Sequence, residues 1–164
     1  AEEAGDVPAL LAVVGTCSEH GGDDDWSDAA ECSLDAYYRL VKGGAASPPA
    51  DRALEVVFGA LRAWGEEEAI VEVALGCVVA TVSSLSESEG AKITPDDETD
   101  LDVSLIVSAM KNFPDESTIQ EQACLALEAV AKSSDVLRGR IRGLDGLREE
   151  LVAARDSRIT NERN

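Results

Sequence analysis

A four-position apolar pattern recurs along this chain at intervals of 44, 49 and 44 residues. Each copy has its positions at i, i+3, i+4 and i+7, which places them on one face of an α-helix. A repeat of this length is typical of proteins that stack helical hairpins in a row. The four copies are Leu10, Val13, Val14 and Cys17; Leu54, Val57, Phe58 and Leu61; Val103, Ile106, Val107 and Met110; and Leu147, Glu150, Leu151 and Ala154, in which Glu150 is polar.

A second helix is predicted after each of the first three copies, at a constant distance from the apolar pattern. Its pattern is a carboxylate, two small residues three positions apart, and an aliphatic residue directly after the second small one. Small residues at this spacing let a neighbouring helix approach closely, so each unit is predicted to be a helical hairpin with a stacking face. The positions are Asp28, Ala30, Ser33 and Leu34; Glu72, Ala74, Cys77 and Val78; and Glu121, Ala123, Ala126 and Leu127.

Turn-forming residues separate the predicted helices at 21–25, 43–49 and 113–116. The five extra residues of the second interval fall in one acidic loop, 86–100, and an insertion confined to a connection leaves the stacked faces in register. We therefore predict an all-α fold, an α-solenoid of about three and a half helical repeats. The chain is predicted to be one domain, 1–164, with repeats at approximately 1–44, 45–90, 91–134 and a partial 135–164.

Two stretches resemble the armadillo-repeat family. Residues 4–11, AGDVPALL, are similar to the start of the family's second helix, and residues 120–127, QEQACLAL, are similar to its third-helix motif. Residues 135–143, DVLRGRIRG, stand where the family has its short first helix. The connections after Val41 and Leu85 show no such short helix, so those units are expected to be HEAT-like hairpins. The resemblance implies a scaffold or adaptor that binds protein and is not an enzyme.

Armadillo proteins that import nuclear cargo read peptides with a tryptophan and an asparagine at fixed positions of successive third helices. None of the corresponding residues matches. The tryptophan positions are Cys32, Gly76 and Leu125, and the asparagine positions are Ala36, Ala80 and Ala129. The resemblance therefore does not extend to that mode of recognising nuclear-localisation peptides.

The charge balance limits the possible partners. The chain has 14 Lys and Arg against 33 Asp and Glu, a net charge of -19. Such a charge repels nucleic-acid phosphates and anionic lipid surfaces, so neither nucleic acid nor a membrane is expected to bind. A protein partner with a basic or mixed-charge surface is the expected complement. Large aromatic side chains often anchor such contacts, and the candidate protein-binding residues are Trp26, Tyr37, Tyr38 and Trp64.

Patterns for catalysis are weak. His20 is the only histidine, and its position after the first predicted helix and before glycine is typical of a solvated helix end. No phosphate-binding glycine loop is present. The acidic runs 66–68 and 149–150 are interpreted as solvated helix faces, with a metal held by such carboxylates as the least favoured alternative. We predict no catalytic residue and no cofactor.

A metal site is not predicted either. A calcium loop beginning at Asp23 would need glycine and glutamate where Asp28 and Leu34 stand. The cysteines, Cys17, Cys32, Cys77 and Cys124, form no CxxC pair, and we interpret them as four buried free thiols.

Free thiols favour a reducing compartment. A cytoplasmic location is therefore expected, with an organelle interior after removal of a transit peptide as the alternative, because the chain begins with Ala1. No apolar run approaches the about 18 residues that a membrane-spanning helix needs. The alternative function is a structural subunit of a large multiprotein assembly, docked through incomplete ends of the repeat row.

Overall fold

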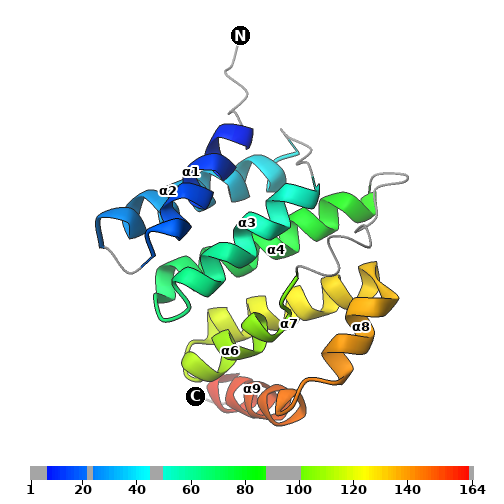
Figure 1. The fold of residues 1–164 in the computed structure, drawn as a ribbon. Helices are drawn as coiled ribbons and strands as arrows, with labels where there is room; N and C mark the ends of the chain where they lie inside the picture. Colours follow the sequence, from blue (N-terminus) through cyan, green and yellow to red (C-terminus); the bar gives the residue numbers. More distant parts are fainter. Residues whose placement is uncertain (1–6, 22–23, 45–49, 88–100, 163–164) are drawn as a thin grey trace.

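The computed structural model describes residues 7–21, 24–44, 50–87 and 101–162, and all regular structure in these ranges is α-helical. Figure 1 shows the helices from α1 at one end of the molecule to α9 at the other. The all-α prediction is confirmed. The helices are α1 (Val7–Glu19), α2 (Asp24–Lys42), α3 (Ala50–Ala63), α4 (Glu68–Glu87), α6 (Ser104–Asn112), α7 (Ser117–Ser133), α8 (Asp135–Arg142) and α9 (Leu147–Glu162).

The predicted breaks agree with the helix ends. Helix α1 ends at Glu19 and α2 begins at Asp24, so the predicted turn 21–25 overlaps the interval between them but its last two residues belong to α2. Helix α3 begins directly after 43–49, and 113–116 separates α6 from α7. The predicted short helix at 135–143 is α8, and the hydroxyl of Ser134 caps its first turn by accepting a hydrogen bond from the Leu137 amide at 3.2 Å. Of the predicted acidic loop 86–100, the first two residues belong to α4 and 88–100 lie outside the described residues.

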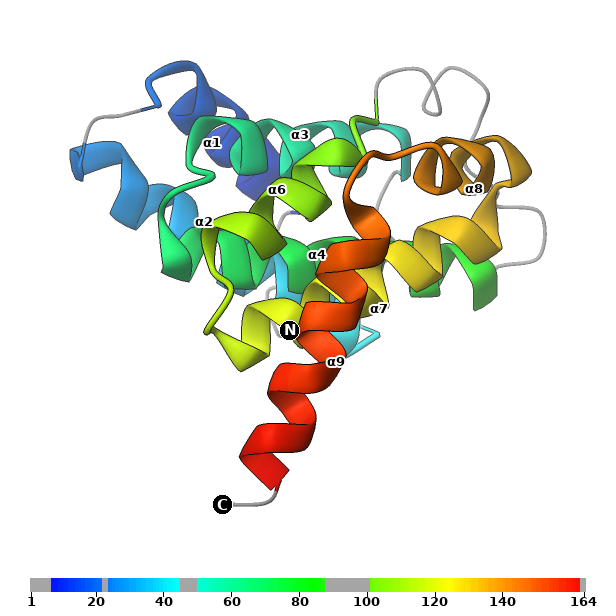
Figure 2. The same cartoon turned by 90° about the horizontal axis from the view of Figure 1, so that it is seen from below.

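The helices pack in consecutive pairs. Helix α1 contacts α2, α3 contacts α4, and α6 contacts α7. Between pairs, α1 contacts α3 and α3 contacts α6 in one layer, while α2 contacts α4 and α4 contacts α7 in the other. The two layers are visible in Figure 2. Helix α9 lies against both α6 and α7, next to the last pair.

The repeated apolar pattern is buried in the middle of the molecule and partly exposed at its ends. All four positions of the second and third copies are buried. In α1, Val14 and Cys17 are buried but Val13 is 42% exposed, and in α9 Leu147 is buried while Leu151 is 39% exposed. The end helices contact their neighbours on one side only, so a position that is buried within the stack is open to solvent there.

The second layer is held by small residues and by polar groups that find partners. Ala30, Ala74 and Ala123 are fully buried, as predicted for a close approach between helices. At the turn between α6 and α7, the buried amide of Gln120 donates hydrogen bonds to the carbonyls of Met110 at 2.8 Å and Phe113 at 2.9 Å. These bonds satisfy carbonyls at the end of α6 and fix the geometry of the turn.

Helix α4 corrects the expectation about apolar runs. Residues Glu68–Leu85 form an 18-residue segment with mean hydropathy 1.7, long and apolar enough by length and composition to cross a membrane. The segment is 56% buried within the protein, where α4 contacts α2, α3 and α7. A central core helix passes the same test of length and hydropathy, and the position of α4 accounts for its composition.

The interpretation of all four cysteines as buried is also wrong in part. Cys17 and Cys77 are buried, Cys124 is half-buried, and Cys32 is exposed on α2; none is in a disulfide. Burial raises the pKa of the Cys17 and Cys77 thiols. The Cys77 thiol also donates to the carbonyl of Leu34 at 3.4 Å, so it joins α4 to α2.

Candidate protein-binding groove

A concave surface on the described residues runs over α2, α4 and α7. It consists of two adjoining hollows, with volumes of about 310 and 430 Å³. Tyr38, Gly76 and Gln122 line both, one from each helix, so they mark where the hollows meet. We call this surface the α2–α4–α7 groove.

One half of the groove is acidic. Its lining includes Glu31 and Asp35 of α2 and Glu72 of α4, and no Lys or Arg. Asp35 makes an exposed ion pair with Arg39 at 2.8 Å, on the same helix. An exposed pair of this kind contributes little to stability. Even with Asp35 paired to Arg39, Glu31 and Glu72 leave this half with a net negative charge, which suits a cationic side chain.

The other half is mostly uncharged. Val79, Ala80 and Ser83 of α4 line it, together with Leu125 of α7, which is 40% exposed. Lys42 is the charged residue of this half. The groove thus changes along its length from carboxylates to small and aliphatic side chains, a change that can orient a partner segment with a basic end and an apolar end.

Tyr38 lies at the junction of the two halves. Its ring packs against the backbone of α4 at Gly76, where an added Cβ would lie 3.3 Å from Cε2 of the ring. The Tyr38 hydroxyl accepts a hydrogen bond from Nζ of Lys42 at 2.8 Å, and this nitrogen lies 5.1 Å from the ring centroid. Because Gly76 has no side chain, the Tyr38 ring can approach α4 closely at this point.

The four aromatic residues predicted to bind protein have different surroundings. Tyr38 lines the groove, and Trp26 is half-buried in the first turn of α2, where its ring stacks on His20 with centroids 4.7 Å apart. Tyr37 is fully buried and Trp64 is 3% exposed, so both belong to the core. We therefore remove Tyr37 and Trp64 from the predicted binding surface.

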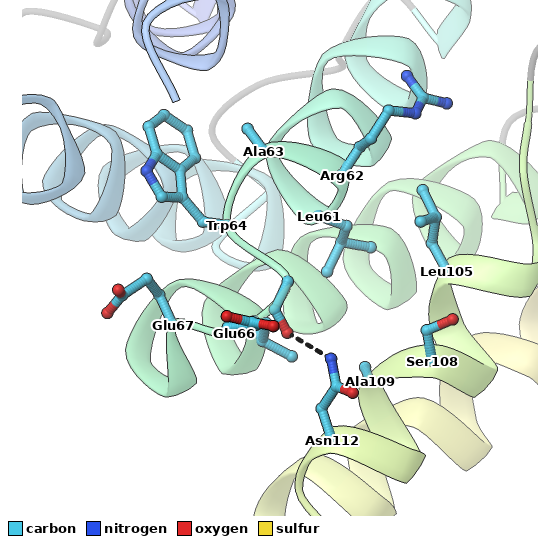
Figure 3. Close-up of a pocket in the computed structure, with 12 residues that line it drawn as sticks. Leu61, Arg62, Ala63, Trp64, Glu66, Glu67, Leu105, Ser108, Ala109 and Asn112 are labelled. Atoms are coloured by element: carbon cyan, nitrogen blue, oxygen red, sulfur yellow. Dashed lines mark hydrogen bonds between the residues drawn. The ribbon is translucent and has the colours of Figure 1, made fainter. Parts of the chain in front are cut away.

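A separate cleft of about 420 Å³ lies beside the α3–α4 turn. In Figure 3 the indole of Trp64 points away from Ser108 and Asn112 on the other side of the cleft. The Asn112 side-chain amide donates to the carbonyl of Gly65 at 3.0 Å and so ties α6 to this turn. The buried indole N–H of Trp64 has no hydrogen-bond partner. The cleft has no arrangement of nucleophile and base, and we assign it no function.

No group of three or more His, Cys, Asp or Glu side chains in the described part of the chain is placed to hold a metal ion. His20, the one histidine, is exposed and its ring stacks on Trp26. Its neighbour Cys17 is buried, with a thiol pKa raised by burial, so the two do not form a reactive pair.

Comparison with known proteins gives no relative: no family model, no curated protein and no solved structure matches this chain. The armadillo resemblance therefore stays a prediction from the sequence.

Most groove residues were missed at the sequence level because they are ordinary charged and small residues. A signal was nevertheless present. Gly76 and Leu125, two of the positions compared with the tryptophans of nuclear-import proteins, both line the groove, and Glu72 belongs to the repeated carboxylate position. Positions that repeat with the unit length face the same side of successive helices, so reading them as a row indicates the groove surface.

Proposed function

We propose that this chain is a non-catalytic protein-binding module, a short α-solenoid of the armadillo or HEAT kind, whose α2–α4–α7 groove takes a basic segment of a partner protein. The repeat spacing and the order of helix contacts support the solenoid part of the proposal. Each helix pair contacts the next, and the pairs follow one another in chain order.

The acidic half of the groove supports the choice of partner. Glu31, Asp35 and Glu72 come from two neighbouring helices and line one hollow. A Lys or Arg side chain placed there meets opposite charge, whereas an acidic segment is repelled. The small and aliphatic side chains of the other half offer a surface for an apolar residue further along the same segment.

A binding measurement with short fluorescent peptides tests the proposal. The probe peptide carries Arg and Lys residues followed by Leu, and a second peptide has the same composition in scrambled order. Wild-type protein is expected to bind the ordered peptide more tightly, with an affinity that falls as salt is added, because the contact depends on charge.

The test variant is Glu31→Gln/Glu72→Gln, and the matched control is Glu55→Gln/Glu116→Gln, which removes the same charge at exposed positions outside the groove. The groove variant is expected to lower the affinity for the peptide about tenfold, and the control variant less than about twofold. The reason is that the peptide is expected to contact the carboxylates of the groove and not those of the control positions. Equal loss in both variants, or binding insensitive to the groove substitutions, would show that the peptide responds to net charge alone.

A further inference from the structure

Large hydrophobic side chains are exposed at the two ends of the helix row. Five such side chains are exposed among the described residues, and three of them are on the end helices: Val13 on α1, and Leu151 and Val152 on α9. Val13 and Val152 are each 42% exposed. A helix that covers a core normally turns a polar face to solvent, so these positions depart from the usual pattern.

On α1 the exposed face has no charge. Ala9, Ala12, Val13 and Thr16 are all exposed, and their spacing of i, i+3, i+4 and i+7 places them on one side of the helix. The only charged residue of α1 is Glu19, at its last position. In a chain with 29% charged residues, an outer helix face of this composition is unusual.

On α9 an exposed face has the same spacing with basic residues at its edges. Arg148, Leu151, Val152 and Arg155 occupy positions i, i+3, i+4 and i+7, and all four are exposed. Arg155 is paired with its neighbour Asp156 at 2.9 Å. The two aliphatic side chains thus lie between two arginines along the helix.

The two faces belong to opposite ends of the same row. Helix α1 packs on α2 and α3, and α9 packs on α6 and α7 (Figure 1). Inside the row, the positions that correspond to Val13 and Leu151 are buried, as for Val57 and Phe58 of α3. A second copy of the chain placed beyond α9 would continue this packing. The α1 helix of that second copy would then lie against α9 of the first copy.

Charge favours this arrangement over contact between two N-terminal ends. Residues 1–44 contain ten Asp and Glu against two Lys and Arg, whereas residues 135–164 contain six Asp and Glu against seven Arg. Contact between two N-terminal ends brings two strongly acidic surfaces together, which is repulsive. Contact between an N-terminal end and a C-terminal end places the arginine-bearing unit against the acidic one.

We propose that the chain associates head to tail, with the α9 face of one copy docked on the α1 face of the next. Such an interface joins two different surfaces, so it can repeat and form open chains of copies. A contact between single helix faces is at the small end of interface sizes and is weak. The groove on α2, α4 and α7 is not used, so the proposal does not depend on the function proposed for it.

Sedimentation velocity of the full chain over a range of concentrations, in salt that screens the overall repulsion, tests the proposal. Wild-type protein is expected to form dimers and longer oligomers as concentration rises. Val13→Asp blocks the α1 face, Val152→Asp blocks the α9 face, and each variant alone is expected to stay monomeric. An equal mixture is expected to form dimers and nothing larger, because only one productive contact remains between the two variants.

Val136→Asp is the matched control, since Val136 is a 51% exposed valine on α8, outside both faces. This variant is expected to associate like wild type, and circular dichroism melting confirms that all three variants stay folded. The proposal is wrong if wild-type protein is monomeric at every concentration, if the mixture stays monomeric, or if Val136→Asp disrupts association as strongly as the other two.

Discussion

The hydroxyl oxygen of Tyr37 on α2 lies 2.7 Å from Oγ1 of Thr81 on α4, in a fully buried hydrogen bond between residues 44 apart in sequence. That separation equals the first repeat interval, so the two residues occupy the same position in consecutive helix pairs. One repeated position thus supplies both partners of the bond. It joins the first two pairs through their second helices.

Removing both partners of this bond is expected to cost less than the sum of the two single changes. Tyr37→Phe leaves the Thr81 hydroxyl buried without a partner, and we expect it to lower the free energy of unfolding by about 1–2 kcal/mol. Thr81→Val is expected to cost a similar amount. In the double variant, the second substitution is expected to cost less than it does in the wild-type protein. Urea denaturation should therefore give a coupling energy of about 1 kcal/mol between the two positions. Simple additivity would mean that the hydrogen bond contributes nothing to stability.

Alkaline pH is expected to destabilise the fold through the same residue. Burial raises the pKa of Tyr37 from 10.0 to about 12, against the opposing effect of its hydrogen bond to Thr81. Between these values the unfolded chain releases the phenol proton while the folded chain retains it. Tyr37 therefore leaves the free energy of unfolding unchanged below pH 10. As the pH rises from 10 towards 12, its ionisation lowers the free energy of unfolding by at most about 3 kcal/mol.

The measurement is urea denaturation at a series of pH values on either side of 10. Tyr37→Phe is the control, and its stability should decline less steeply in this range. Part of the decline remains in the control, because the buried Cys77 thiol also has a raised pKa. If the stability of both proteins declines equally with pH, the pKa of Tyr37 is not raised by burial and this prediction is wrong.

Two glycines within helices give a paired prediction. At Gly59 of α3 an added Cβ meets nothing within 4 Å, so Gly59→Ala is expected to raise the free energy of unfolding by about 0.5–1 kcal/mol through helix propensity. At Gly76 of α4 the added Cβ lies 3.3 Å from the Tyr38 ring, which must shift. Gly76→Ala should therefore raise the free energy of unfolding by less than Gly59→Ala does, as measured by thermal and chemical denaturation. An equal increase in the two variants would indicate that the Tyr38 ring moves freely.

Thiol modification is expected to follow exposure. Cys32 is exposed, Cys124 is half-buried, and Cys17 and Cys77 are buried. A maleimide reagent should modify Cys32 first and Cys124 more slowly, since the Cys124 pKa is raised by burial and by Glu121. Peptide mass spectrometry over time checks the order, and Cys32→Ser should remove the fast phase. Early modification of Cys77 in the native protein would contradict its position between α2 and α4.

The repeat spacing predicts the helices and most of their ends. This succeeds because a buried stacking face must recur wherever one helix pair meets the next, and turns such as 113–116 need residues that stop a helix. The same pattern cannot tell an inner pair from an outer one. Val13 and Leu151 therefore fit the repeat but lie exposed, since burial at those positions depends on a neighbour and not on the local sequence.

The residues that line the groove were harder to predict, for a geometric reason. Tyr37 and Tyr38 are adjacent in sequence, but consecutive residues of a helix point about 100° apart. One side chain therefore packs inside against Thr81, and the other reaches the groove over Gly76. The sequence indicates the aromatic pair, whereas the packing of α2 on α4 decides which of the two rings is buried and which lines the groove.

The position of α4 predicts how the molecule opens. Helix α4 has α2, α3 and α7 around it, whereas α1 and α9 each pack against two helices at opposite ends of the row. Amide hydrogens in an outer helix exchange with solvent after a local fluctuation, but those of α4 require neighbouring pairs to separate first. Exchange protection should accordingly rise from both ends towards α4, so that the fold loosens from its ends while its centre stays ordered.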